Sequence, residues 1–221
     1  MSRSYGQYRG LARALDIVGD RWNLLIVRQL LIAPARYREL LDGLPGVATN
    51  LLTDRLRDLG SAGVVERRLA EEANAIVYAL TPWGTELREP IEGLISWSTP
   101  LMARGPGGDR FQTNWPIVAL RALLTGSVTA HQAQTVGIAV DGRLLQVRAT
   151  DSGIEVSPHE GGDLDAVLRA ESLIVLGLAA GALTFDDVRG LVEIEGDEAA
   201  ARVLFTEGGR NAAVGDRGPA L

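Results

Sequence analysis

The side chains best suited to chemistry lie on one face of a helix predicted over residues 48–61. Leu52, Leu56 and Leu59 recur at helical spacing on one side and predict a buried stripe. The opposite side carries small polar and charged residues, namely Thr49, Asn50, Thr53, Asp54 and Arg57. Amide, hydroxyl and guanidinium groups on one helix face can contact base edges and phosphates. We expect Asn50 and Thr53 to reach bases and Arg57 to contact phosphate; Thr49 either joins them or caps the helix.

Residue types needed for catalysis or metal binding are scarce. The chain has no cysteine, which excludes disulfides, thiolate nucleophiles and thiol redox sensing. His131 precedes a predicted strand and His159 lies in a loop, so neither forms part of a Ser/His/Asp set. Asp186 and Asp187 are consecutive, and we expect them to cap a short helix over 186–190. The sequence therefore predicts no enzyme, no cofactor and no metal site.

Helices and a hairpin surround the 48–61 segment. Periodicity predicts helices over 8–18, 21–32 and 37–44, with Asp20 capping the second. Strand-like runs over 64–69 and 76–80 flank a polar tip and predict a hairpin. Thr81 and Pro82 favour the start of a long helix that ends near Leu101. This order is typical of a winged helix-turn-helix, which places one helix in the major groove and a hairpin wing beside it.

Short motifs of this half occur with a characteristic order and spacing. They are DIVGDRWNLLIVRQL at 16–30, RYREL at 36–40, LPGVA at 44–48 with Leu52, Arg55 and Leu56, GVV at 63–65, and YALTPWG at 78–84. Together they resemble the HxlR family of bacterial, MarR-like transcriptional regulators over residues 8–100. The resemblance implies a homodimer that binds double-stranded DNA at a palindromic operator.

Two features of the chain depart from that family. Members often carry an N-terminal cysteine used in sensing, and this chain has none. The predicted wing tip holds Glu71 and Glu72, which repel phosphate and argue against deep insertion into the minor groove.

Three further arginines are candidates for phosphate contacts. Arg36 begins the helix over 37–44, where family members place a contact to the DNA backbone. Arg67 and Arg68 alternate along the first strand of the wing, so we expect one to face DNA and the other to be solvated.

Other conspicuous side chains favour structural roles. Trp22 lies on the apolar stripe of its helix and is expected in the core. For Arg28 an ion pair with Asp16 or Glu39 is favoured over a DNA contact. Tyr78 is expected in the core or at a dimer interface.

The dimer interface is expected to combine the N-terminal helix with the helix over 81–101. The second of these carries more apolar side chains than a small winged domain can cover, among them Leu94, Ile95 and Trp97.

A segment rich in glycine and proline over 102–110 divides the chain into domains of residues 1–104 and 105–221. In the second domain the patterns predict helices over 115–124, 172–180 and 197–205, the last capped by Asp197, and strands over 135–140, 143–149, 154–157, 165–170 and 191–195. The fold class is therefore α+β, with a winged helix-turn-helix followed by an antiparallel sheet covered by helices.

The second domain carries Leu176, GALT at 181–184, VEIEGD at 192–197 and a helix ending in Leu204-Phe205. These motifs resemble the sterol carrier protein type 2 fold, in which a sheet and helices enclose a lipophilic tunnel. The resemblance implies an apolar small-molecule ligand, for which the candidate lining residues are Phe111, Trp115, Leu173 and Leu176. The alternative is a packed core without a ligand that acts as an oligomerisation spacer.

Charge is distributed unevenly along the chain. Residues 1–104 hold 13 Arg against 12 acidic residues, whereas residues 105–221 hold 9 against 16. Only the first half can offer a basic face to DNA. The N-terminus has no apolar signal-peptide core, and the apolar run over 172–185 is too short to span a bilayer, so a cytoplasmic protein without membrane association is expected.

The combined prediction is a homodimeric transcriptional regulator, acting as a repressor, controlled by an apolar effector in the second domain. The competing hypothesis is a lipid or metabolite carrier that uses the helical domain as an interaction scaffold. Salt-dependent binding to duplex DNA distinguishes the two, because a DNA-binding protein releases counterions.

Overall fold

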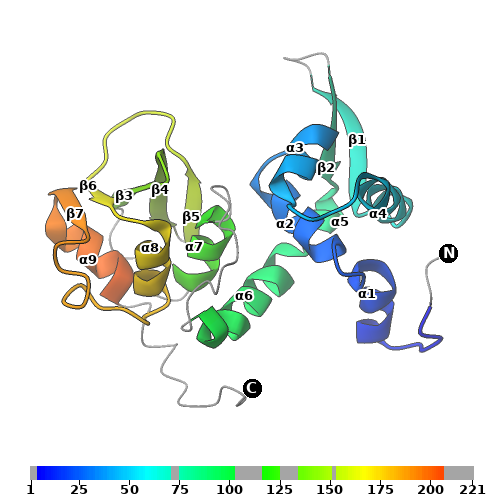
Figure 1. The fold of residues 1–221 in the computed structure, drawn as a ribbon, viewed down its shortest axis with the longest axis horizontal. Coiled ribbons are helices and arrows are strands. Elements are labelled where there is room, and N and C mark those ends of the chain that lie inside the picture. The colour runs from blue at the N-terminus through cyan, green and yellow to red at the C-terminus, as the bar shows by residue number, and fades with distance from the viewer. Residues whose placement is uncertain (1–3, 71–74, 103–115, 125–133, 151–152, 207–221) are drawn as a thin grey trace. The chain divides into compact units, whose positions relative to one another are not determined.

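The computed structural model describes residues 4–70, 75–102, 116–124, 134–150 and 153–206 (Figure 1). The chain separates into two compact units, Met1–Ile91 and Glu92–Leu221. This division falls inside a helix, whereas most of the predicted linker over 102–110 lies outside the described residues. The expected domain boundary after residue 104 therefore stays a prediction.

The first unit is a winged helix-turn-helix, as the sequence predicts. Its elements are α1 (Gly10–Val18), α2 (Asn23–Ile32), α3 (Tyr37–Gly43), α4 (Thr49–Ser61), β1 (Val65–Ala70), β2 (Ala75–Leu80) and α5 (Pro82–Thr85). The strands β1 and β2 pair antiparallel, with Arg67 opposite Tyr78. A bridge from Ala35 to Tyr78 attaches the hairpin to the segment before α3. Figure 1 shows the hairpin extending away from the helices.

The core of this unit is built from one side of each helix. Ile26 of α2 and Leu40 of α3 are fully buried, and Leu52, Leu56 and Leu59 of α4 are 0–3% exposed. Each such side chain stabilises the fold by about 1.5–3 kcal/mol relative to exposure. The predicted leucine stripe of the fourth helix is therefore confirmed, and it determines which side of α4 faces water.

Two details at the start of α2 differ from the sequence prediction. The helix begins at Asn23 rather than at residue 21, and Asp20 does not cap it. The Asp20 carboxylate instead accepts from the Arg55 guanidinium of α4, a charged partner that outcompetes a neutral backbone amide. Trp22 is half-buried rather than enclosed in the core.

The predicted long helix after the wing is interrupted. Thr81 caps α5 as expected, accepting from the Gly84 amide at 3.0 Å. The chain then restarts as α6 (Arg88–Met102). Pro90 explains the break, because it has no N–H for the Glu86 carbonyl in a continuous helix but is tolerated in the first turn of a new one.

The second unit is an α+β fold with a five-stranded sheet. Its other elements are α7 (Pro116–Leu124), β3 (Thr135–Val140), β4 (Arg143–Thr150), β5 (Gly153–Pro158), β6 (Ala166–Arg169), α8 (Ser172–Ala179), β7 (Glu193–Gly196) and α9 (Glu198–Thr206). The strand order is β5-β4-β3-β6-β7. Helix α7 packs on β5 and α8, and α9 packs on β6 and β7. Helix α6 belongs to this unit from Glu92 onward, and Glu92 pairs with Arg121 of α7 at 2.9 Å.

Local signals account for most of this unit. Asp141 and Gly142 have φ of 48° and 76°, the left-handed pair that a tight β3–β4 turn requires. Asp197 caps α9 as predicted, accepting from the Ala199 amide at 2.9 Å. The sheet is not purely antiparallel, because β6 runs parallel to β3. The segment after β5 crosses the sheet to the far side of β3, and periodicity along one strand carries no information on such a crossover.

The predicted short helix over 186–190 is absent. The segment forms hydrogen-bonded turns, in which the Asp187 carboxylate accepts from the Thr184 amide at 2.8 Å and from its hydroxyl at 2.6 Å. These bonds replace helix-capping bonds and close a turn instead. They also lower the pKa of Asp187 below its ordinary value of 3.8.

No helix among the described residues is long and apolar enough to cross a membrane. Within the same described ranges, no cluster of three histidine or acidic side chains could hold a metal ion.

Replacing Asp187 with asparagine should lower the melting temperature at neutral pH and have no effect in strong acid. The folded carboxyl has a depressed pKa, so its stabilisation is present above 3.8 and is lost as pH falls through the lowered value. Melting curves of Asp187→Asn and of the wild type should therefore converge below pH 3.8. Asp186→Asn is the matched control, because that exposed carboxylate pairs only with exposed Arg189. A difference between D187N and wild type that does not change with pH would contradict this assignment.

Candidate nucleic-acid interface

The water-facing side of α4 carries the predicted contact residues. Thr49, Asn50, Thr53 and Arg57 are all exposed, while the leucines behind them are buried. The four side chains thus share one surface, as the helical period requires. Ala48, not Thr49, occupies the capping position, and Thr49 is the first residue of the helix. The capping role considered for Thr49 is therefore wrong.

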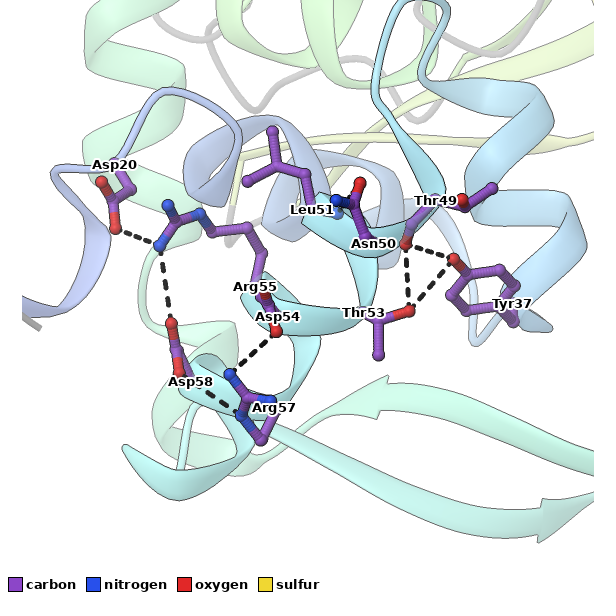
Figure 2. A network of polar contacts seen from close by, with 10 residues as sticks. All are labelled: Asp20, Tyr37, Thr49, Asn50, Leu51, Thr53, Asp54, Arg55, Arg57 and Asp58. Atoms are coloured by element: carbon purple, nitrogen blue, oxygen red, sulfur yellow. Dashed lines mark hydrogen bonds and ion pairs between the residues drawn. The ribbon is translucent and has the colours of Figure 1, made fainter. Parts of the chain in front are cut away.

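Tyr37 of α3 holds the first turn of α4 in place (Figure 2). Its hydroxyl donates to the Thr49 carbonyl at 2.7 Å and lies 3.2 Å from the Thr53 hydroxyl. Thr53 Oγ1 also donates to the Thr49 carbonyl, at 3.0 Å. The Thr53 hydroxyl thus already donates its hydrogen to a carbonyl of the protein. Toward a ligand, Thr53 can accept a hydrogen bond or make an apolar contact through its methyl group. No role was assigned to Tyr37 from the sequence, although it lies inside the RYREL motif.

Asn50 is placed to present an amide to solvent. Its Oδ1 accepts from the Leu51 amide at 2.9 Å, which satisfies one of the free N–H groups of the first helical turn. The Nδ2 group keeps two donors, and Oδ1 keeps a second lone pair. An asparagine with a free donor and a free acceptor can form the paired hydrogen bonds that distinguish adenine from other bases.

Arg57 is balanced by acidic neighbours on its own helix. Its Nη2 lies 2.8 Å from Asp54 Oδ1, and its Nε lies 3.9 Å from Asp58 Oδ1. All three side chains are substantially exposed, so the pairs contribute little stability. They nevertheless reduce the positive potential at this part of α4, and a phosphate must compete with Asp54 for the guanidinium.

Arg55 joins α4 to the turn between α1 and α2. Its guanidinium pairs with Asp20 and lies 3.5 Å from Asp58 (Figure 2). The Arg55 side chain is only 22% exposed, so this residue anchors the helix rather than contacting a ligand. Beside this contact lies a polar hollow of about 590 Å³, whose lining includes Asp16, Asp20, Asp54 and Asp58 together with Arg55 and Arg57. Carboxylates therefore outnumber guanidinium groups in this acidic hollow.

The three further candidate arginines lie directly before α3 and on the first strand of the wing. Arg36 is exposed, and its backbone amide donates to Glu39 Oε2 at 2.7 Å. On β1, the Arg67 guanidinium carbon is 5.9 Å from the centre of the Tyr78 ring, whereas Arg68 lies 4.0 Å from Glu66. Arg67 and Arg68 point to opposite faces of the hairpin, as adjacent strand residues must. Which of them faces DNA stays a prediction.

Arg28 lies inside the fold rather than on this surface. Burial lowers the pKa of its guanidinium to about 10. The ion pair favoured for Arg28, with Asp16 or Glu39, stays a prediction. Asp16 binds the Tyr5 amide at 2.8 Å and lies 4.0 Å from Arg13, and Glu39 caps the start of α3. Placement at the buried side of α2 agrees with a structural role for Arg28.

The candidate ligand residues of the second unit do not form one surface in the described part of the chain. Leu176 is buried in α8, whereas Leu173 of the same helix is 44% exposed. Phe111 and Trp115 lie outside the described residues, as do His131 and the wing-tip residues Glu71 and Glu72. His159 lies on a loop with its Nδ1 3.3 Å from Gln146 Oε1. A tunnel lined by these residues stays a prediction.

Helix α4 has buried leucines on one side and amide, hydroxyl and guanidinium groups on the other. A hairpin with exposed arginines follows it. This combination defines a winged helix-turn-helix DNA-binding module. Residues 17–105 match the model of the HxlR-like helix-turn-helix family. The HTH-type transcriptional regulator YodB of Bacillus subtilis (strain 168) is 31% identical over 86 residues, which are 38% of this chain and 77% of YodB. YvaP of the same organism, also named an HTH-type transcriptional regulator, is 42% identical over 89 residues, 39% of this chain and 82% of YvaP.

Solved structures of similar sequence align with less than half of this chain. Quinone-bound YodB from B. subtilis is 29% identical, with 41% of this chain and 96% of that chain aligned and a TM-score of 0.36. A regulator of the MarR family from Enterococcus faecalis V583 is 27% identical over 47% of this chain and 96% of that chain, with a TM-score of 0.38. The family match and the coverage of YodB and YvaP show that the protein belongs to the HxlR-like helix-turn-helix family, and that its N-terminal half is that of a DNA-binding transcriptional regulator. The family match ends at residue 105, so the comparison with sterol carrier proteins stays a resemblance of sequence motifs.

Replacing Tyr37 with phenylalanine should destabilise the protein by about 0.5–1.5 kcal/mol, the usual worth of one hydrogen bond. The substitution keeps the ring and removes only the hydroxyl that donates to the Thr49 carbonyl. Chemical denaturation of the full chain measures the loss. Tyr8→Phe is the control, because Tyr8 is 93% exposed and loses no contact of its ring. Equal stability of the Tyr37→Phe variant and the wild type would show that Tyr37 does not hold α4.

Proposed function

We propose that the protein is a homodimeric repressor that binds a palindromic DNA operator through the N-terminal half of α4. The observation that carries the proposal is the exposed Asn50 amide on a helical turn that Tyr37 fixes from α3. Fixing the turn before DNA arrives lowers the entropy lost on binding. Repression follows from occupancy, since a dimer bound over a promoter excludes other proteins.

Phosphate contacts are assigned to the arginines outside the acidic hollow. Arg36 precedes α3, and Arg67 stacks near Tyr78 without the carboxylate neighbour that Arg68 has in Glu66. We therefore favour Arg67 over Arg68 for the wing contact. Arg57 takes part by exchanging Asp54 for a phosphate oxygen, which makes its contribution smaller than that of an unpaired arginine.

Dimerisation is assigned to exposed apolar side chains on two helices. On α1, Leu11 is 74% exposed and Leu15 is 38% exposed. On α6, Leu94, Trp97 and Leu101 follow helical spacing and are 48%, 76% and 47% exposed. Surfaces of this kind mark interfaces in a protein of this size. Two-fold symmetry of the dimer would match the symmetry of a palindromic site.

The second unit is assigned to binding an apolar small molecule that controls the dimer in the bacterial cytoplasm. Support comes from α8, whose eight residues are apolar apart from Ser172, packed in a fold with helices on a sheet. We propose that this half is not an enzyme. The competing hypothesis, a carrier with the helical domain as a scaffold, predicts duplex binding that is weak and insensitive to salt.

Replacing Asn50 with alanine should weaken binding to the specific operator by about 1–3 kcal/mol and leave binding to random DNA nearly unchanged. The operator is first selected from a random duplex library with the full-length protein, and affinities are then measured at several salt concentrations. Arg36→Ala should weaken both kinds of DNA and reduce the salt slope by about 1. Ser61→Ala, an exposed change at the other end of α4, is the control. Equal weakening on both DNAs by Asn50→Ala would assign it to positioning only, and absence of salt-dependent binding would favour the carrier.

Replacing Trp97 with aspartate should raise the dimer dissociation constant by about 30-fold, the effect of removing a strong interface tryptophan. Native mass spectrometry of the full chain reports the dimer and any co-purified apolar ligand together. Leu191→Asp is the control, since Leu191 is also exposed (62%) but lies outside α1 and α6. An undisturbed dimer in the Trp97→Asp variant would move the interface elsewhere.

A further inference from the structure

An apolar pocket lies inside the winged helix-turn-helix itself, separate from the second unit. Its cavity volume is about 260 Å³, and its lining comes from α1, the start of the wing, and the α5 region. The lining residues are Ala14, Ile17, Val18, Val64, Trp83, Glu86 and Leu87. A cavity of about 150 Å³ with similar aliphatic walls can hold a benzene molecule in another protein. This pocket therefore has room for about two fused rings.

The lining has two chemical features beyond its aliphatic walls. The Trp83 side chain is 51% exposed, which leaves part of its indole available to a ligand. Glu86 is the one ionisable residue of the lining, and it is exposed. An indole face attracts cations through its ring quadrupole, and a carboxylate does so through its charge.

We propose that this pocket binds a small aromatic amine in its cationic form. The ring system contacts Ile17, Val18 and Val64, and the ammonium group lies between Glu86 and the Trp83 face. Neutral aromatic molecules of the same shape bind more weakly, and aromatic carboxylates are excluded.

The pocket lies between elements that carry the candidate DNA contacts. The Val64 amide donates to the Leu59 carbonyl of α4 at 2.9 Å, and the Val64 carbonyl accepts from the Thr81 amide at 3.1 Å. The Ile17 carbonyl accepts from the Asn23 side chain of α2 at 2.7 Å. A ligand that displaces Val64 or Ile17 therefore moves α4, the wing or α2. This part of the inference, an effect of the amine on operator affinity, rests on the proposed function.

Binding is tested on the full-length protein by isothermal titration calorimetry. The probes are 1-naphthylmethylammonium, 1-naphthylmethanol and 1-naphthoate, which share one ring system and differ in charge. We expect the ammonium ion to bind about tenfold more tightly than the alcohol, and no binding by the carboxylate. Equal affinity for the ammonium ion and the alcohol, or no heat from any probe at millimolar concentration, would overturn the proposal.

Variants locate the site. Glu86→Gln should abolish the preference for the cation over the alcohol, while Glu89→Gln, the same charge change at an exposed position outside the lining, should preserve it. Ala14→Phe fills the pocket from an exposed position on α1 and should weaken binding of all probes at least about tenfold. Melting temperatures near that of the wild type confirm that these variants fold. Unchanged affinity in a folded Ala14→Phe variant would place the ligand elsewhere. If sedimentation shows that Ala14→Phe dissociates the dimer and no probe binds the wild type, the pocket is instead covered by a second copy of the chain.

The effect on DNA is measured separately, with and without saturating 1-naphthylmethylammonium. A change in operator affinity that Glu86→Gln removes supports coupling. Tight probe binding with unchanged operator affinity overturns the coupling and leaves the binding site standing. Absence of DNA binding under all conditions overturns the proposed function without touching the calorimetric result.

Discussion

Burial of the leucine stripe of α4 determines the rest of the DNA-binding unit. Leu52, Leu56 and Leu59 cannot leave the core without losing several kcal/mol, so the helix has one permitted rotation about its axis. That rotation places Asn50 and Arg57 in water. Tyr37 and Arg55 then restrict the helix further, the first at its N-terminal turn and the second through Asp20. The polar face is thus a consequence of the packing behind it.

Charge along α4 is graded rather than uniform. Its N-terminal turn carries neutral polar groups and the positive end of the helix dipole, which favours a nearby phosphate. Its later turns carry Asp54 and Asp58 beside Arg55 and Arg57. A uniformly basic helix would bind any DNA through phosphates, whereas the carboxylates of this helix reduce its non-specific attraction to phosphates.

The sequence predicted elements well where one local pattern dominated. The leucine spacing of α4, the Thr81 cap and the Asp141-Gly142 turn each depend on residues close in the chain. The sequence-based prediction was wrong where a partner far away in the chain competed for the same polar group. Asp20 binds Arg55, 35 residues away, instead of capping α2. The Thr49 carbonyl accepts from both Thr53 and Tyr37, and the periodicity of α4 cannot predict a contact from a residue of α3. The parallel pairing of β6 with β3 likewise depends on a crossover and not on either strand.

The lack of cysteine limits how such a regulator can respond to its surroundings. Without a thiol, no cysteine adduct or disulfide can hold the protein in one state, so a response through cysteine oxidation is excluded. A reversible ligand shifts a two-state equilibrium only by its difference in affinity for the two states. A ligand site in contact with elements that change position can produce this difference in affinity with few contacts. Val64 hydrogen-bonds to both α4 and Thr81, so the affinity of a ligand that contacts Val64 depends on the positions of α4 and Thr81. A ligand enclosed by the second unit must instead act through whatever joins the two units. A ligand bound inside the DNA-binding unit would therefore act on α4 and the wing directly, whereas a ligand of the second unit would act on them indirectly.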